Sequence, residues 1–300
     1  MMLPMDGFTE QRIDVGDGVR IAAEVGGAGP PVLLLHCYPQ HRAMWRDVAP
    51  ALAQRFTVVA TDLRGYGQSS KPPGDAAHLG YAKRTMAADQ VAVMRQLGFD
   101  RFAVCGHDRG ARVAHRMCLD HPQAVAAAAV VDIVPTLHLL ETTDRAFAGA
   151  YYHWFFLSQP APLPERLIGA AATDFLTMTL DRWSGPGFKF PPQALGAYVA
   201  AFDAAAIHAS CEDYRAAATI DLDHDAADRE RRIDCPLLVL WGERGAMHRL
   251  YDVPETWRDR AREVTARSLP CGHFVAEEAP EETVASLLAF LEEVPAWAAG

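Results

Sequence analysis

The sequence predicts an α/β fold with a mostly parallel, doubly wound sheet and a helical insertion. Short apolar runs of strand type alternate with amphipathic helical segments, and this alternation is typical of parallel sheets covered by helices. The alternation stops over residues 135–232, which contain no convincing buried strand. We therefore expect a core of residues 1–134 and 233–300, with 135–232 inserted as a helical cap at the carboxyl ends of the strands, where such sheets bind ligands.

The individual elements follow from periodicity and from the residues that begin or end them. Gly16-Asp17-Gly18 is a hairpin signal between two short strands, and Gly98 is typical of a helix C-terminus. Continuous apolar runs indicate strands that are buried on both faces. We expect strands at 11–15, 19–25, 31–36, 56–61, 101–105, 123–133, 236–241 and 265–269, and helices at 44–55, 81–97, 111–117 and 280–293.

The most informative stretch is Gly106-His107-Asp108-Arg109-Gly110. It has the G-x-S-x-G pattern of a nucleophile elbow with aspartate in place of serine, and it lies between a strand-type run and a helix-forming run. A carboxylate is already an anion at neutral pH and needs no base before it attacks. Asp108 therefore predicts displacement at a saturated carbon or opening of an epoxide. The alternative is that Asp108 only caps the following helix, a position where aspartate is common.

The overall charge argues against some partners and raises a question about others. The chain has 300 residues and a formal net charge of -10, which argues against binding to nucleic acid or to an anionic membrane surface. An anionic substrate would be repelled unless local cations focus the field at the site. The cysteines are scattered without a metal-binding spacing, and the first residues lack the features of a signal peptide. We expect a soluble cytoplasmic protein that needs no metal and no organic cofactor.

Further motifs resemble the α/β-hydrolase fold almost from end to end. His36-Cys37-Tyr38-Pro39 resembles the oxyanion loop after the third strand, and Cys271-Gly272-His273-Phe274 resembles the loop that carries the catalytic histidine. Residues 62–69 resemble a loop shared by epoxide hydrolases and dehalogenases. More narrowly, four strings in order look like haloacetate (fluoroacetate) dehalogenases: residues 106–112, 131–136, 153–156 and 212–216.

The residues and the resemblance together predict a catalytic triad. Asp108 is the expected nucleophile, and His273 is the expected general base for the hydrolytic water, a task that suits its usual pKa near 6.5. The histidine needs an orienting acid. Asp132, a polar residue at the end of an apolar run, is the first choice, although it could instead be a turn or helix cap. Glu243, which follows the strand at 236–241, is the fallback.

Two arginines beside the nucleophile point to a substrate with a carboxylate. In haloalkane dehalogenases the residue after the nucleophile is usually a tryptophan, whereas here it is Arg109. Arg112 lies three residues further on, so both side chains can face Asp108 from one side of the helix start. They would form a clamp for a carboxylate, and the helix N-terminus would add to the positive field. The alternative is ordinary surface salt bridging.

If the arginines hold the acid end of the substrate, the leaving group must be bound elsewhere. The resemblance assigns halide binding to His153, Trp154 and Tyr214, all in the cap segment, with an aromatic core as the alternative for each.

The oxyanion loop departs from the family pattern. Cys37 stands where the family more often has glycine, and it can shift the backbone donors. Tyr38 adds a hydroxyl at the expected pocket floor. Trp183 is either a further wall of the pocket or part of the core.

The predicted function is a hydrolytic dehalogenase of short 2-halo carboxylic acids, which converts fluoroacetate or chloroacetate and water into glycolate and halide through an ester on Asp108. An epoxide hydrolase with the same triad is the first alternative, with Tyr214 and either Tyr151 or Tyr152 protonating the epoxide oxygen. A ligand-binding receptor without turnover is the second. The resemblance also implies a homodimer.

Overall fold

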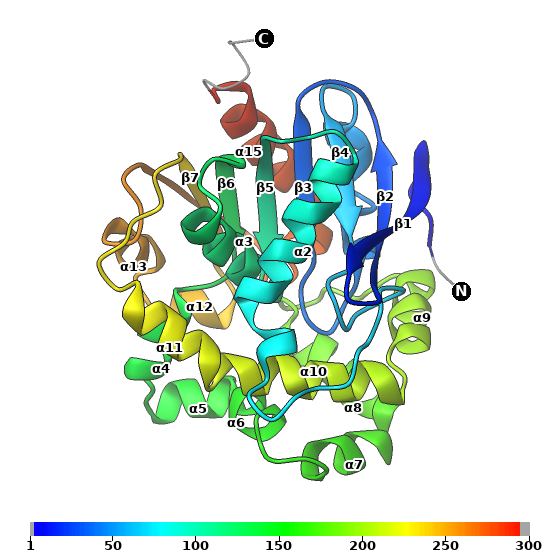
Figure 1. Ribbon diagram of the computed structural model, residues 1–300. Coiled ribbons are helices and arrows are strands. Elements are labelled where there is room, and N and C mark those ends of the chain that lie inside the picture. Colours follow the sequence, from blue (N-terminus) through cyan, green and yellow to red (C-terminus); the bar gives the residue numbers. More distant parts are fainter. Residues whose placement is uncertain (1–2, 295–300) are drawn as a thin grey trace.

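Residues 3–294, the part of the chain that the computed structural model describes, contain one eight-stranded sheet in the order β1-β2-β4-β3-β5-β6-β7-β8 (Figure 1). β2 is antiparallel to both β1 and β4, and the other neighbours are parallel. All eight predicted strands are present with small shifts at their ends. Their bounds are β1 Phe8–Gly16, β2 Val19–Gly26, β3 Pro31–Leu35, β4 Thr57–Thr61, β5 Phe102–His107, β6 Val125–Val131, β7 Leu237–Gly242 and β8 Val264–Leu269.

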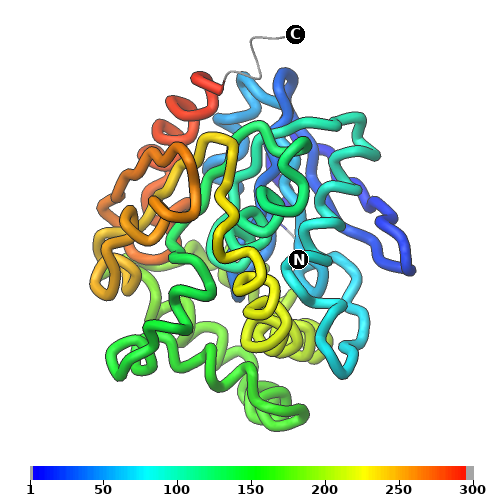
Figure 2. Tube along the Cα trace, turned by 60° about the vertical axis from the view of Figure 1, so that its left-hand side comes forward, coloured from blue at the N-terminus to red at the C-terminus, as the bar shows by residue number. Residues whose placement is uncertain are grey.

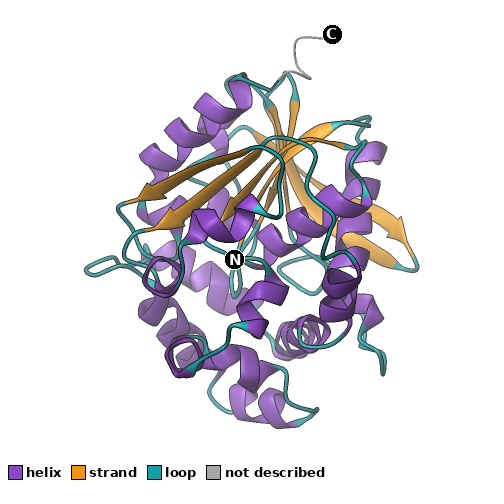
Figure 3. Ribbon diagram, turned by 90° about the vertical axis from the view of Figure 1, so that its left-hand side faces the viewer, coloured by secondary structure: helices purple, strands orange, loops and turns teal. Residues whose placement is uncertain are grey.

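The central strands are apolar because helices cover both of their faces. Every residue of β5, β6 and β7 is buried, as expected for parallel strands between two helical layers. Figure 3 shows these helices on both sides of the twisted sheet. α2 packs against α3, and α3 packs against β5 and β6. The helices of this layered part are α1 Ala49–Leu52, α2 Lys83–Gln96, α3 Arg109–Asp120, α12 Ala246–Leu250, α13 Val253–Arg258, α14 Val275–Glu278 and α15 Pro280–Glu292, with 3-10 turns η1 Arg42–Trp45 and η2 Leu79–Tyr81.

The chain between β6 and β7 is helical, as its composition predicts. Figures 1 and 2 show these helices gathered at one end of the sheet, beyond the carboxyl ends of the parallel strands. The chain returns to the sheet at Ile233, which forms an isolated parallel bridge with Ala261. The helices are α4 Thr136–Glu141, α5 Arg145–Ala150, α6 Tyr152–Leu157, α7 Leu163–Gly169, α8 Ala172–Trp183, α9 Pro192–Ala201, α10 Ala204–Ala217 and α11 Ile220–Ala227.

One predicted helix is wrong. Residues 44–55 do not form a continuous helix, because η1 ends at Trp45 and α1 begins at Ala49. Pro50 is the second residue of α1, where the missing N–H costs no hydrogen bond. In a helix that ran on from residue 44, the same proline would remove an internal hydrogen bond and clash with the preceding turn. The periodicity of the apolar residues could not reveal this break.

No single helix among residues 3–294 has the length and hydropathy needed to cross a membrane. One bent pair, Pro192–Ala201 with Ala204–Ala227, passes the same test on length and composition alone.

Candidate active site

Asp108 lies on the sharp turn between β5 and α3, as the elbow motif predicts. Its backbone has φ 47° and ψ -108°, a left-handed conformation that residues other than glycine rarely adopt. Asp108 occupies the N-cap position of α3, but its side chain makes no capping hydrogen bond, so the alternative that Asp108 serves only to cap the helix is wrong. One carboxylate oxygen, Oδ2, instead accepts a hydrogen bond from the loop after β3.

Gly106 and Gly110 make this turn possible because neither position has room for a side chain. A Cβ on Gly106 would lie 2.3 Å from the carbonyl oxygen of Gly110. A Cβ on Gly110 would lie 2.6 Å from the backbone of Leu35, and the Gly110 N–H donates to the His36 carbonyl oxygen at 3.0 Å. The start of α3 therefore packs directly on the end of β3, which brings the two loops together.

His273 and Asp132 form a hydrogen-bonded pair next to Asp108. His273 follows β8, and its Nδ1 lies 2.6 Å from Oδ2 of Asp132, which follows β6. Oδ1 of Asp132 accepts a hydrogen bond from the N–H of Gly242 at 3.1 Å. The fallback acid, Glu243, is exposed and accepts a hydrogen bond from Ser268 at 2.8 Å. The fold thus brings Asp132, and not Glu243, to the histidine.

The surrounding charges favour an ionised Asp108 and a more basic His273. Burial by itself raises the pKa of the Asp108 carboxyl, but nearby positive charges, with His273 the largest, outweigh burial and hold this pKa below its usual value. For His273, burial lowers the pKa, but the hydrogen bond and charge of Asp132 outweigh burial and raise the pKa above its usual value. The site therefore contains an anionic carboxylate beside an imidazole that takes up a proton easily.

The loop after β3 donates a backbone hydrogen bond to Asp108. The N–H of Tyr38 donates to Oδ2 of Asp108 at 3.1 Å. Its neighbour Cys37 is buried, with Sγ 3.2 Å from Nε2 of His273 and 3.6 Å from Oδ2 of Asp108. Cys37, which stands where the family more often has glycine, therefore leaves the Tyr38 N–H within hydrogen-bond distance of Asp108. It also adds a thiol next to Nε2 of His273, the nitrogen that would accept the proton.

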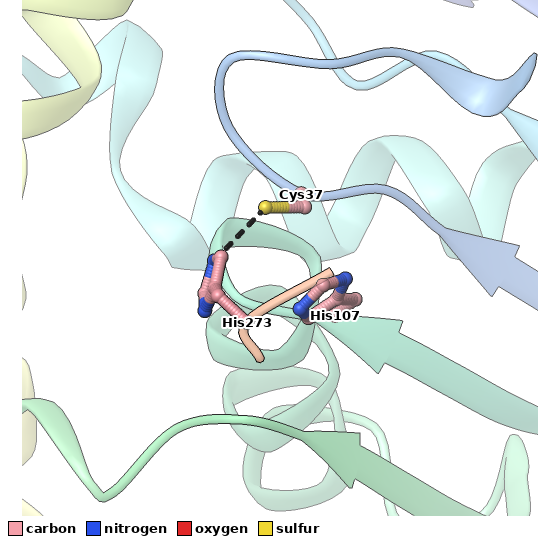
Figure 4. A group of neighbouring side chains, drawn as sticks. All are labelled: Cys37, His107 and His273. Carbon is pink, nitrogen blue, oxygen red and sulfur yellow. Dashed lines mark hydrogen bonds between the residues drawn. The ribbon is translucent and has the colours of Figure 1, made fainter. Parts of the chain in front are cut away.

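Cys37, His107 and His273 place three ligand-type atoms within 4.8 Å of one another, from two loops and the end of β5 (Figure 4). Sulfur and imidazole nitrogen are the ligands that zinc prefers. A cysteine binds a metal as thiolate, however, and burial together with the charge of Asp108 raises the pKa of the Cys37 thiol well above its usual value. The trio therefore favours a neutral thiol hydrogen-bonded to His273, and we assign it no metal.

Arg109 and Arg112 are buried beside Asp108, but other residues of the protein accept hydrogen bonds from some of their guanidinium N–H groups. Nε and Nη2 of Arg109 form a two-point ion pair with Asp213 at 2.9 and 2.7 Å. Nη1 of Arg112 donates to Thr136 at 2.9 Å and to a backbone oxygen. Within residues 3–294, Nη1 of Arg109 and Nε of Arg112 are buried without a hydrogen-bond partner. The predicted clamp is therefore narrower than expected, because Asp213 and Thr136 occupy several of its donors, whereas these two buried donors remain free for a carboxylate.

Asp213 holds Arg109 in place, although the sequence pattern does not single it out. It lies on α10, is fully buried, and also accepts hydrogen bonds from Nζ of Lys83 and, at 2.6 Å, from the hydroxyl of Tyr66. Burial raises the pKa of the Asp213 carboxyl, but the charges of Arg109 and Lys83 outweigh it and lower this pKa. The network ties α10 of the helical segment to α2 and α3 at the site.

His153, Trp154 and Tyr214 meet above the two arginines. The ring of Tyr214 is in edge-to-face contact with Trp154 at 5.4 Å and with His153 at 5.6 Å. The guanidinium of Arg109 lies 4.2 Å from the centre of the Tyr214 ring, and that of Arg112 lies 4.7 Å from the Trp154 ring. The Tyr214 hydroxyl and Nδ1 of His153 are buried and find no partner in the described part of the chain. Burial and the charge of His273 lower the pKa of His153 well below its usual value, so its ring is neutral.

Tyr38 and Trp183 complete the walls of this pocket. The Tyr38 ring lies 5.3 Å from Tyr214 and 6.1 Å from Trp183, and its buried hydroxyl has no partner among the described residues. The Trp183 ring lies 4.4 Å from His153 and 5.3 Å from His273. The Trp183 carbonyl oxygen also accepts the His273 N–H at 3.0 Å. Of the two expected positions for Trp183, the geometry favours a wall that faces the base.

Comparison with known proteins agrees with this architecture. A family model described as the alpha/beta hydrolase fold matches residues 30–280. The chain belongs to the α/β hydrolase fold family. In this α/β hydrolase, the elbow after β5, the acid after β6 and the histidine after β8 come from the carboxyl ends of three different strands. The family assignment therefore rests on most of the chain.

Two curated relatives align with nearly the whole of this α/β hydrolase. It is 48% identical over 290 residues to a fluoroacetate dehalogenase from Burkholderia sp, covering 96% of this chain and 95% of the relative. It is 32% identical to a soluble epoxide hydrolase from Corynebacterium sp. (strain C12), covering 91% and 94%. A crystal structure described as an alpha/beta hydrolase from Nostoc sp PCC 7120 is 55% identical, with a TM-score of 0.93 over 95% of this chain and 98% of that chain.

Proposed function

We propose that this protein is a hydrolytic dehalogenase of short 2-halo carboxylic acids, which converts fluoroacetate or chloroacetate and water into glycolate and halide. The proposal rests on the two buried donors beside Asp108, Nη1 of Arg109 and Nε of Arg112, which have no partner among residues 3–294. A buried charged donor without a partner is costly, and a substrate carboxylate supplies one. The 48% identity to the Burkholderia sp fluoroacetate dehalogenase supports the same substrate class.

In the first half-reaction, Asp108 attacks the carbon that carries the halogen. A carboxylate oxygen forms the C–O bond of an ester while the carbon–halogen bond breaks and its electron pair leaves with the halide. The donors for the leaving halide are His153, Trp154 and Tyr214. Each hydrogen bond to a charged group contributes about 1.5–3 kcal/mol. Fluoride depends on them most, because its charge is the most concentrated.

In the second half-reaction, His273 accepts a proton from water, and the water oxygen attacks the carbonyl carbon of the Asp108 ester. The negative charge that develops on the carbonyl oxygen is stabilised by the N–H of Tyr38, which already binds Oδ2 at 3.1 Å, and by the N–H of Arg109. One such donor is typically worth about 2.7–4 kcal/mol. Asp132 orients the imidazole and stabilises its protonated form. Collapse of the intermediate breaks the C–O bond to the substrate, and the glycolate oxygen takes the proton held by His273. The carboxyl group of Asp108 then loses its remaining proton to solvent, which restores the carboxylate.

Epoxide hydrolysis with the same triad is the second candidate. The 32% identity to the Corynebacterium sp. enzyme supports it, as do the unpartnered hydroxyls of Tyr38 and Tyr214 within the described part. A helping tyrosine would be Tyr151, which is 8% exposed, rather than Tyr152, which is 40% exposed. A neutral epoxide, however, offers no partner to two buried arginine donors. Comparison of styrene oxide with chloroacetate as substrates separates the two functions.

The proposed chemistry is tested by halide release and by one turnover in heavy-oxygen water. Purified protein should release fluoride from fluoroacetate and chloride from chloroacetate. With enzyme in excess, the label should enter the Asp108 carboxylate, and the glycolate of the first turnover should be unlabelled. Labelled glycolate in the first turnover would mean direct attack by water and would exclude the ester. Hydrolysis of styrene oxide without halide release would favour the second candidate.

The pH dependence tests the roles of His273 and Asp132. His273 acts as a base only when neutral, and its pKa is raised, so kcat should fall as the pH drops through a value above 6.5. Asp132→Asn removes the main cause of the raised pKa. We expect the acid limb to move to lower pH and the plateau to fall by roughly 10²–10⁴-fold. The matched control is Glu243→Gln, which should change neither the acid limb nor the plateau of kcat. If Glu243→Gln lowered kcat and Asp132→Asn did not, Glu243 would be the acid that orients His273.

A further inference from the structure

A cleft of about 270 Å³ opens beside the proposed base and is rich in arginine. Its inner wall includes His273, Trp183 and Tyr151. Its outer wall includes three residues that we call the arginine rim: Arg182 at the end of α8, Arg244 after β7, and Arg249 on α12. The cleft thus runs from solvent to the imidazole that would act on the ester.

The arginine rim carries positive charge that nearby carboxylates do not neutralise. All three arginines are exposed, and within residues 3–294 none of them forms an ion pair, while no acidic residue lines the cleft. Two acids near the rim are engaged elsewhere, Glu243 by Ser268 and Asp181 by Lys189. Two more lie behind the cleft wall: Asp132 is bound by His273 and the Gly242 N–H, and Glu278 accepts three backbone N–H groups. A larger cleft, of about 510 Å³, differs sharply, because four carboxylates line it.

Backbone contacts hold two of these guanidinium groups at the rim. Nη1 of Arg249 donates to the carbonyl oxygens of Arg244 and Gly245 at 3.1 and 3.2 Å. Nη2 of Arg182 donates to the carbonyl oxygen of Gly149 at 2.9 Å, and its guanidinium lies 5.5 Å from the Tyr152 ring. These contacts position the charges without neutralising them. The field of Arg182 reaches inward, since Arg182 is one of the charges, after burial, that lower the pKa of His153.

We propose that the arginine rim is an anion-capture site through which small carboxylates enter the active site and hydroxy-acid product leaves. The identity of the carboxylate rests on the proposed dehalogenase function, but the capture of an anion does not. The net charge of -10 repels an anion at long range, and screening limits that repulsion to about 8 Å at physiological salt. Inside that distance, three unpaired cations reverse the sign of the field. The buried donors of Arg109 and Arg112 then take the carboxylate over.

The test is charge reversal at the rim in two measurements on the folded protein. In the variant Arg182→Glu/Arg244→Glu, kcat/KM for chloroacetate at low ionic strength should fall by about tenfold or more, with kcat within about twofold of wild type. The difference should vanish near 1 M salt, where screening acts within about 3 Å. The matched control is Arg95→Glu/Arg101→Glu, which makes the same change of net charge at two exposed arginines, one at the end of α2 and one before the amino end of β5, far from the cleft.

The second measurement is the association rate of glycolate, followed by stopped-flow tryptophan fluorescence, which needs no turnover. The association rate of glycolate should fall in the rim variant by about the same factor as kcat/KM, and this difference from wild type should also vanish at high salt. A salt-dependent, rim-dependent association rate without halide release would uphold the capture site and refute the dehalogenase. Halide release with equal kcat/KM in rim and control variants at every ionic strength would refute the capture site alone. No measurable binding of glycolate would also refute it.

Discussion

Replacement of Asp108 by alanine is expected to lower halide release from chloroacetate by at least about 10⁴-fold. The proposed mechanism has no second route to the ester, because the other carboxylate of the site, Asp132, is bound by His273 and by the N–H of Gly242. Without Asp108, a water molecule activated by His273 would have to displace the halide directly. A water molecule is a weaker nucleophile than a carboxylate that is already ionised. Halide release under saturating chloroacetate measures the effect.

The matched control for this variant is Asp100→Ala, which removes an exposed carboxylate just before β5 and should leave the rate unchanged. Glycolate should still bind to Asp108→Ala, because the free donors of Arg109 and Arg112 remain. Retained binding would show that the site is folded. Residual halide release within about tenfold of wild type would contradict the assignment of the nucleophile. A wild-type protein that binds glycolate but releases no halide from any haloacid would point to a receptor.

The substitution Asp213→Asn is expected to lower the free energy of unfolding by about 3–5 kcal/mol. Asp213 is the shared partner of Arg109 and Lys83, and all three side chains are buried. Removal of its charge leaves the buried Arg109 without an ion-pair partner among residues 3–294, and leaves the buried Lys83 with Asp221 alone, at 3.7 Å. The measurement is urea unfolding at neutral pH. The loss of a fixed Arg109 should also raise KM for chloroacetate, because Arg109 would no longer hold its free Nη1 toward the substrate.

Two controls and a pH series distinguish this effect from a general loss of charge. Asp181→Asn removes the partner of Lys189 in an exposed pair and should cost about 1 kcal/mol or less. In the double variant Asp213→Asn/Lys83→Met, the buried cation next to Arg109 is also removed, so part of the stability should return. Equal losses in Asp213→Asn and Asp181→Asn would contradict the buried network.

The sign of the pH dependence follows from the lowered pKa of Asp213 in the folded state. Its contribution to stability is present above the unfolded pKa of about 3.9 and is lost as pH falls through the lower folded value. The difference in unfolding free energy between wild type and Asp213→Asn should therefore be constant at neutral pH and shrink below about pH 5.

Local patterns in the sequence predicted the sheet well. The strands at β3, β5, β6 and β7 were recognisable because helices cover both faces, which demands unbroken apolar runs. The prediction of a helix at 44–55 was wrong because it relied on the helical spacing of the apolar residues. Pro50 lies inside this segment and is tolerated only in the first turn of a helix, so the helix begins at Ala49. The site residues Asp108, Asp132 and His273 were recognisable because each directly follows a strand or occurs in a short motif.

Contacts between distant segments could not be predicted in the same way. Asp213 and Arg109 are 104 positions apart in the chain. The residues around Asp213 do not reveal that its carboxylate accepts hydrogen bonds from Nε and Nη2 of Arg109. Cys37 and His273 are 236 positions apart, so the thiol beside the base also became visible only in the folded chain. The arginine rim is assembled from α8, α12 and the loop after β7, which meet only when the helical segment packs over the sheet.

The sequence by itself determined the turn, the proposed nucleophile on it and the order of its partners along the chain, because backbone conformation and strand burial depend on neighbours within a few residues. Only the tertiary structure decided which donors remain free for a substrate. That outcome depends on how buried charges are shared: Asp213 takes two donors of Arg109, Thr136 takes one of Arg112, and the remaining buried donors are left for a carboxylate.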